Sequence, residues 1–209
     1  DEIVFNTKGD YAANIELAVG NLAIKNTNEA KENSEVVNTG NEHSVEAVAD
    51  LLNIEVYKIV KTLIVHGEDQ EGNISDELIA LLLRGDQELN EIKAQKLQGV
   101  ASPLKFASDE LIKKKIGCGI GCLGPSNLKL RKIADHSVEN LFNFTCGANQ
   151  PGKHITNMNW SEDCVYEEVA DIRKVQGNDY SLDGDGILSV KRGIEVGHIF
   201  QLGKKYSDA

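Results

Sequence analysis

The sequence lacks several features that would place it in a large class of proteins. No apolar run approaches the roughly 20 residues that a membrane-spanning helix needs, and no signal peptide opens the chain. Basic charge is also scarce, because 22 Lys and Arg stand against 33 Asp and Glu and the formal net charge is -11. Such a chain is not expected to bind long nucleic acids tightly, although contact with one end of an RNA stays open. We therefore expect no membrane partner and no DNA partner.

Cysteine is scarce as well, with four in 209 residues, and the four form no closely paired framework. A chain of this length with 41% hydrophobic residues can bury a core without disulfide bonds. We therefore expect a reducing, cytoplasmic location. The first residue is Asp1 rather than Met, and we expect the sequence to be a piece of a longer protein.

Hydrophobic periodicity predicts interleaved strands and helices. Helices are predicted over residues 11–25, 45–52, 88–97 and 109–116, with Ser44 and Ser108 as N-caps. Strands are predicted over residues 2–6, 60–67, 77–85, 130–138, 143–149, 154–160, 164–172 and 193–203. The polar segment 26–43 is predicted to be a linker or a surface excursion. Because the later strands follow one another closely, we expect a mixed α/β (α+β) fold with a mixed, largely antiparallel sheet and packed helices, in which the two chain ends share a sheet.

The stretch GCGIGCLGP at 117–125 matches two familiar motifs that its context argues against. Its glycines have the G-x-G-x-x-G spacing of a dinucleotide-binding loop, but a Lys-rich helix precedes them and a proline follows. Cys118 and Cys122 could supply two ligands to a zinc ion that takes four, and no second pair lies at ligand spacing. We interpret the cysteines as small apolar residues of a tight loop and expect no metal.

Two ionisable residues stand out, and each has a plain alternative interpretation. His154 opens a strand rich in polar residues, where it is either functional or an ordinary surface or hydrogen-bonded histidine. Lys61 lies inside an apolar run, where its side chain either reaches out to solvent or faces a pocket. Spacing and composition leave both questions open.

Several stretches, spread from about residue 10 to residue 208, occur together and in this order in one known family. They are YAANIELA, SVEAVADLLNI, VKTL, LLRGDQELNEIK, GCLGP, ADHSV, NFTCGAN, H-x-x-N-x-N-W, VADIRKVQ and RGIEVGHIFQLGKKYS. The ordered set resembles the bacterial-type prolyl-tRNA synthetase and, within it, the inserted editing domain. That domain shares its fold with small free-standing aminoacyl-tRNA deacylases.

The resemblance implies three segments. Residues 1–24 and 187–209 would be flanking strands from a class II catalytic core, and residues 25–186 would be the inserted editing domain. The implied activity is hydrolysis of the ester of alanine mischarged onto tRNA for proline, since a proline pocket cannot exclude a smaller amino acid by fit alone. The alternatives are a catalytically silent insertion that positions the synthetase core and a free-standing trans-editing deacylase.

The same resemblance implies the partners. The chain would act on the aminoacyl end of tRNA for proline and would contact the rest of the synthetase chain, whose parent enzyme would be a homodimer. The parent would ligate proline to tRNA with ATP and Mg. The motifs that bind ATP are missing here, so we expect this piece to edit without a cofactor and not to aminoacylate.

The resemblance also implies a site. Lys61 and His154 match the pocket lysine and the histidine after G-A-N, and we expect them to be catalytic. Residues matched to, or predicted for, substrate binding are Val45, Val48, Gly121, Leu123, Gly124, Pro125 and Asp135. With no nucleophile paired to a base, we expect non-covalent hydrolysis in which N–H groups around Gly121 and Gly124 hold the oxyanion. Lys61 would contact the terminal phosphate or ribose, and His154 would orient the amino acid.

Overall fold

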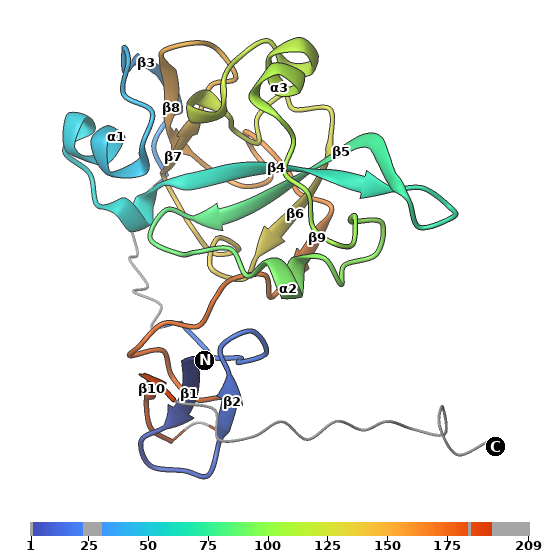
Figure 1. Ribbon diagram of the computed structural model, residues 1–209. Coiled ribbons are helices and arrows are strands. Elements are labelled where there is room, and N and C mark those ends of the chain that lie inside the picture. Colours follow the sequence, from blue (N-terminus) through green and yellow to red (C-terminus); the bar gives the residue numbers. More distant parts are fainter. Residues whose placement is uncertain (1, 23–30, 184, 194–209) are drawn as a thin grey trace. The chain divides into compact units, whose positions relative to one another are not determined.

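The computed structural model describes residues 2–22, 31–183 and 185–193. It divides the chain into two compact units, one made of residues 1–21 with 175–209 and one made of residues 22–174 (Figure 1). The unit boundaries thus fall after residues 21 and 174, whereas the sequence prediction places them after residues 24 and 186. The assignment of the outer segments to a synthetase core stays a prediction.

The smaller unit contains a three-stranded antiparallel sheet in the order β10–β1–β2, formed by Leu188–Arg192, Glu2–Asn6 and Ala12–Asn14. The predicted strand at 2–6 is confirmed. The predicted strand at 193–203 lies almost entirely outside the described residues, but the segment just before it, β10, pairs with β1. Val4, Ala18, Val175 and Leu188 form the core of this unit.

The helix predicted over residues 11–25 is wrong. Ala12–Asn14 pairs with β1 instead, and the Asn14 side chain accepts the N–H of Glu16 at 2.9 Å, which turns the chain out of the strand. Tyr11, Ala13, Ile15 and Ala18 pack in the core of the smaller unit from this strand and turn, because strand pairing within the unit outweighs the weak local helix preference.

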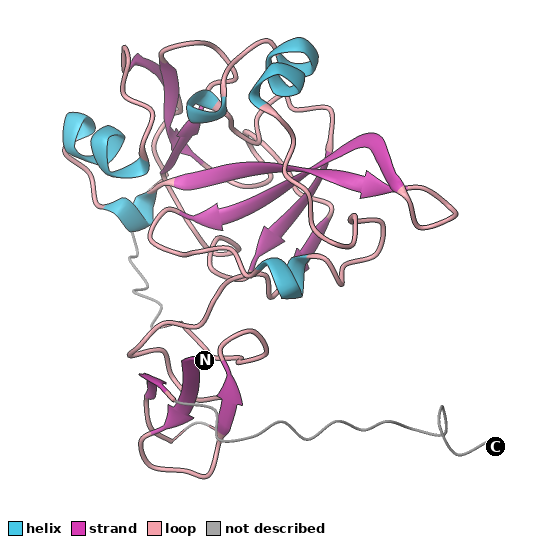
Figure 2. Cartoon of the chain, in the orientation of Figure 1, coloured by secondary structure: helices cyan, strands magenta, loops and turns pink. Residues whose placement is uncertain are grey.

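The larger unit is built on a four-stranded sheet in the order β4–β5–β6–β9. Its strands are Val60–Glu68, Ile74–Arg84, Arg131–Asp135 and Glu168–Ala170. The pair β4–β5 is antiparallel and the other two pairs are parallel. A second, antiparallel sheet has the order β3–β8–β7, formed by Glu35–Asn38, Lys153–Met158 and Phe144–Gly147. The mixed α+β fold with largely antiparallel pairing is thus confirmed (Figure 2).

Helices in the larger unit are short. They are α1 (Val45–Leu52), α2 (Glu91–Ala94) and α3 (Asp109–Ile116), with 3₁₀ turns η1 (Val56–Lys58) and η2 (Ile120–Cys122). Ser44 and Ser108 accept backbone N–H groups of α1 and α3, so both predicted N-caps are confirmed. None of the described helices has the length and apolar character needed to cross a membrane.

Two further predictions need correction. The helix predicted over residues 88–97 is a single turn, because Leu89 is held in a bridge with Arg173 and Asn90 caps α2 from an extended conformation. The predicted linker 26–43 contains strand β3, which pairs with β8. Its polar composition reflects an edge strand with two exposed residues at its start, since only one neighbour is needed to satisfy its backbone.

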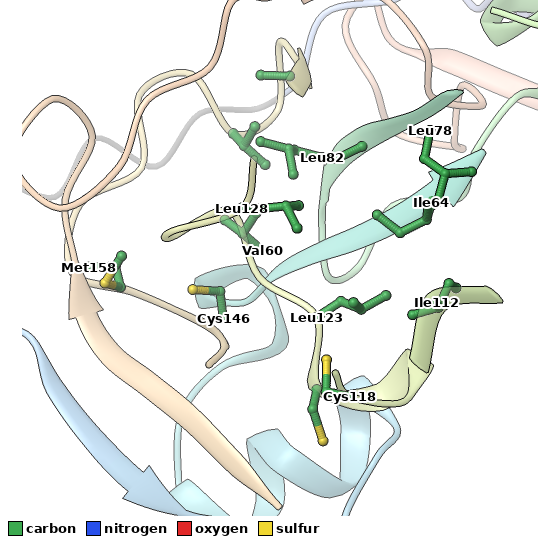
Figure 3. Packing of buried hydrophobic residues seen from close by; sticks show 14 of the residues in the cluster. Val60, Ile64, Leu78, Leu82, Ile112, Cys118, Leu123, Leu128, Cys146 and Met158 are labelled. Carbon is green, nitrogen blue, oxygen red and sulfur yellow. The ribbon is translucent and has the colours of Figure 1, made fainter. Parts of the chain in front are cut away.

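The four-stranded sheet separates two clusters of buried side chains. One face carries Val60, Ile64 and Leu82, which pack with Leu123, Ile112 of α3 and Cys146 of β7 (Figure 3). The other face carries the alternating side chains of the same strands, such as Val65 and Leu81, which pack with Ala94 of α2. In Figure 1, α3 and the second sheet accordingly lie on one side of β4 and α2 lies on the other.

Candidate active site

A hollow of about 210 Å³ lies at the beginning of β4, where the two sheets approach each other. A parallel bridge between Ile59 and Thr145 joins the start of β4 to β7 at this place. The hollow is lined by His43, Ser44, Val45, Val48, Ile59, Val60, Lys61, Thr62, Leu63, Ile120, Gly121, Leu123, Gly147 and His154. Of the predicted site residues, Lys61, His154, Val45, Val48, Gly121 and Leu123 meet here, and Gly124, Pro125 and Asp135 do not line it.

Helix α1 supplies one apolar wall. The hydroxyl of Ser44 accepts the N–H of Ala47 at 3.1 Å and fixes the first turn, while Asn53 ends the helix in the left-handed region with φ 52°. One turn apart on the same face, Val45 and Val48 both reach the hollow. The wall is therefore set by a capped helix rather than by a free loop.

Lys61 lines the hollow, and its ammonium donates to the carbonyl oxygen of Gly85 at 3.2 Å. Burial lowers the pKa of Lys61, and the nearby carboxylates of Glu88 and Asp86 act in the opposite direction. The bond to Gly85 uses one of three N–H donors. A half-buried ammonium held in this way can offer its other donors to an anionic or carbonyl group.

His154 is 5% exposed, in the middle strand of the β3–β8–β7 sheet. Its Nδ1 lies 2.8 Å from the hydroxyl oxygen of Thr39, a buried residue that fixes the plane of the imidazole. Burial, assisted by the neighbouring His43, lowers the pKa of His154. The ring is thus neutral near pH 7. Thr39 contacts Nδ1, so this contact leaves the other ring nitrogen, Nε2, unused.

Gly121 is required by a close approach to His43. A Cβ at Gly121 would lie 2.4 Å from the Cβ of His43, which no packed side chain tolerates. Gly121 is also the second residue of η2, a position whose N–H has no partner inside a 3₁₀ turn. Its N–H is therefore available as a hydrogen-bond donor at the wall of the hollow.

Gly124 has a structural role that differs from the predicted one. Its N–H donates to Oδ1 of Asn149 at 2.9 Å, so it is not available to an oxyanion in this structure. A Cβ at Gly124 would lie 1.8 Å from the carbonyl oxygen of Gly147, because the two backbones cross here. Asn149 also donates to the carbonyl oxygens of Gly124 and Ser126 and ties the loop with the buried Pro125 to the end of β7.

Asp135 lies at the end of β6, fully buried and away from the hollow. One carboxylate oxygen accepts the N–H of Ser137 at 2.8 Å, and the other accepts those of Ile172 and Arg173 at 2.9 and 3.1 Å. Three backbone donors account for both oxygens. The carboxylate thus joins β6 to the chain after β9 and does not reach the pocket.

The cysteines of the loop are buried and free. Burial raises the pKa of the Cys118 thiol to about 11, and the sulfur of Cys122 accepts the N–H of Gly152 at 3.3 Å. Both pack in the core cluster below α3. Their interpretation as small apolar residues of a tight loop agrees with this placement.

Three polar side chains at or beside the hollow are not identified as site residues from the sequence. Thr39 and His43 fall in the segment predicted to be a linker, and Thr62 follows the lysine that drew attention. Alternation along β4 could have identified Thr62, because it is the polar residue between Val60 and Ile64 on a buried face. No local signal places Thr39 beside His154, since their contact depends on the pairing of β3 with β8.

A second hollow of about 610 Å³ adjoins the first and shares His43, Ser44, Ile120 and Gly121 with it. Its other lining residues include Asp109 and Lys113 of α3. The volume falls in the range of ~300–1,000 Å³ typical of ligand sites, whereas the first hollow is smaller. The two together form a small chamber opening beside a larger one.

Comparison with known families connects this geometry to a function. The family model of the aminoacyl-tRNA editing domain matches residues 39–163, a range that contains every residue lining the first hollow. The chain belongs to this family. It is therefore an aminoacyl-tRNA editing domain, a kind of domain that acts on the aminoacyl ends of tRNA.

Solved structures share the fold of this editing domain. A candidate trans-editing enzyme for prolyl-tRNA synthetase is 21% identical with a TM-score of 0.53, over 68% of this chain and 87% of that one. A hypothetical protein is 22% identical with a TM-score of 0.52, over 68% of this chain and 92% of that one. At these identities the similarity concerns the fold alone.

Proposed function

We propose that this editing domain hydrolyses the ester bond that joins alanine to tRNA for proline. The observation that carries the proposal is the small hollow in which Lys61, His154 and the N–H of Gly121 face the apolar wall of Val45 and Val48. Support for alanine comes from the size of this chamber, since a short apolar wall favours a methyl side chain over the larger ring of proline. Support for the tRNA comes from the resemblance to the prolyl-tRNA synthetase insertion.

The proposed reaction is non-covalent. A water oxygen attacks the carbonyl carbon of the ester, and the carbon–oxygen bond to the terminal ribose breaks as that oxygen takes up a proton. The N–H of Gly121 stabilises the negative charge that develops on the carbonyl oxygen. The ammonium of Lys61 binds the ribose or the terminal phosphate, and the neutral imidazole of His154 orients the aminoacyl group through Nε2.

We further propose that the chain is a segment of a prolyl-tRNA synthetase, in the cytoplasm, whose remaining parts hold the tRNA. This part rests on the stretch RGIEVGHIFQLGKKYS near the C-terminus, which resembles a synthetase core. ATP, Mg and the dimer contacts would belong to that parent enzyme, and editing itself would use none of them.

Release of amino acid from alanyl-, prolyl- and cysteinyl-tRNA for proline tests the activity. We expect selective release of alanine, and Lys61→Ala should slow it by about a hundredfold, because the ester is misplaced when the ammonium that holds the ribose or phosphate is lost. The control is Lys114→Ala, because Lys114 is exposed and does not line the hollow.

Two results would contradict the proposal. Equal release from all three tRNAs would remove the assignment of alanine, and a folded protein without any release would indicate a silent insertion. If Lys61→Ala unfolds the domain, its role is structural, so circular dichroism of each variant accompanies the assay.

A further inference from the structure

Thr62 is a polar side chain on an otherwise apolar face. It pairs with Leu82 across β4 and β5, and it lies between Val60 and Ile64 in the strand. All three neighbours belong to the core cluster that also contains Leu123. Strand alternation therefore directs Thr62 to the face where η2 and β7 lie.

The hydroxyl of Thr62 has no hydrogen-bond partner among residues 2–22, 31–183 and 185–193, although the side chain is only 4% exposed. Other buried polar side chains near it are satisfied, as the contact between Thr39 and His154 illustrates. Burying a hydroxyl without a partner costs free energy, and a valine would fill nearly the same volume without that cost. The hydroxyl thus weakens the fold at this position unless something else binds it.

The position of Thr62 indicates what binds it. Thr62 lines the small hollow together with Gly121 and His154. The N–H of Gly121 and the ammonium of Lys61 are donors, suited to the carbonyl and phosphate oxygens of the substrate. A hydroxyl can accept from an ammonium and donate to an amine, so it suits the one remaining polar group of an amino-acid ester in either protonation state.

Building on the proposed function, we propose that the Thr62 hydroxyl hydrogen-bonds the α-amino group of the amino-acid ester in the small hollow. The fit of the hollow then depends on an amino group at one end and a short apolar side chain at the other. An acyl group without nitrogen loses this contact and keeps all the others.

The test compares alanyl-tRNA with propionyl-tRNA, which has the same carbon chain without the amino group. Thr62→Val should lower kcat/KM for alanyl-tRNA by about tenfold or more, the effect of losing one hydrogen bond in a buried site, and leave propionyl-tRNA nearly unchanged. Thr62→Ser keeps the hydroxyl and should restore most of the activity on alanyl-tRNA. In urea unfolding, Thr62→Val should be at least as stable as the unchanged chain, because an unpaired hydroxyl is replaced by a methyl group.

The other outcomes would contradict the proposed contact or the function on which it rests. Full activity of Thr62→Val on alanyl-tRNA, or an equal loss on both substrates, would overturn the contact with the amino group. A marked loss of stability in Thr62→Val would reveal a partner within the fold and overturn it as well. If the unchanged chain releases no alanine, the proposed function fails and takes this inference with it, whereas failure of the inference alone leaves alanine release by the unchanged chain intact.

Discussion

At the scale of single residues, burial determines the charge that His154 carries. Its pKa is lowered from an ordinary value of 6.5 by burial and by His43. The unfolded chain therefore takes up a proton near pH 6.5 while the folded chain still resists it. Stability contributed by this residue is present above about pH 6.5 and is lost as the pH falls towards the folded pKa.

We expect the same lowered pKa to shape the pH dependence of editing. If the neutral imidazole orients the substrate, kcat/KM should hold as the pH falls through 6.5 and decline only at more acidic pH. His43→Ala should move that decline to higher pH, because it removes one of the two causes of the shift. The measurement is a pH profile of alanine release, corrected for hydrolysis without protein.

The exposed His136, which pairs with Glu139, provides the control. His136→Ala should leave the profile unchanged. A decline centred at or above the ordinary histidine value would contradict the neutral state of His154, and a decline that survives in His154→Ala would assign it to another group.

Single residues also show which parts of the site the sequence can predict and which parts it cannot. The family resemblance predicts Lys61 and His154 as site residues, and the structure brings them to one hollow. Asp135 was matched by the same resemblance, yet its carboxylate oxygens accept hydrogen bonds from three backbone N–H groups. A motif identifies a residue type at a position. Whether the polar atoms of that residue can contact a substrate depends on hydrogen-bond partners distant in sequence, such as the N–H of Ile172.

At the scale of elements, short-range signals were sufficient where caps and periodicity agreed, as in α1 and α3. They failed for residues 11–25 and 88–97, where contacts with distant strands or segments replace most of the helix. The G-x-G-x-x-G spacing illustrates the same point, since its last glycine is needed where the loop crosses Gly147 and not for phosphate binding.

This crossing predicts a large effect of one methyl group. Gly124→Ala should destabilise the larger unit by about 3 kcal/mol or more, because the new Cβ would overlap the carbonyl oxygen of Gly147 and neither backbone can move freely. Gly119→Ala, five residues earlier, is the matched control. Gly119 is extended with φ -82°, and its Cβ would meet only ordinary contacts, so its effect should stay within about 0.5 kcal/mol.

Urea unfolding of both variants measures the difference. Similar stability of Gly124→Ala and the unchanged chain would show that the loop can separate from β7. That result would also restore Gly124 as a candidate oxyanion donor, because its bond to Asn149 depends on the same contact.

At the scale of the whole molecule, the site and both faces of its sheet belong to one unit. The buried clusters on the two sides of β4 and β5, and the cluster under α1, all consist of residues between 45 and 172. The smaller unit has a separate core. The family match ends at residue 163, before β9 and the two N–H groups that bind Asp135.

Two truncated chains test whether the folded domain ends at residue 174, where the larger unit ends, or at residue 163, where the family match ends. A chain of residues 31–174 should unfold cooperatively and keep alanine release within about threefold, because it retains every contact of the site and its core. A chain of residues 31–163 should lose about 3 kcal/mol or more, since the buried carboxylate of Asp135 would lose two donors and Ile172 would leave the core. Circular dichroism melting and the release assay test both chains. If the shorter chain is as stable as the longer one, Asp135 does not anchor the sheet, and if the longer chain fails to fold, the larger unit depends on the smaller one.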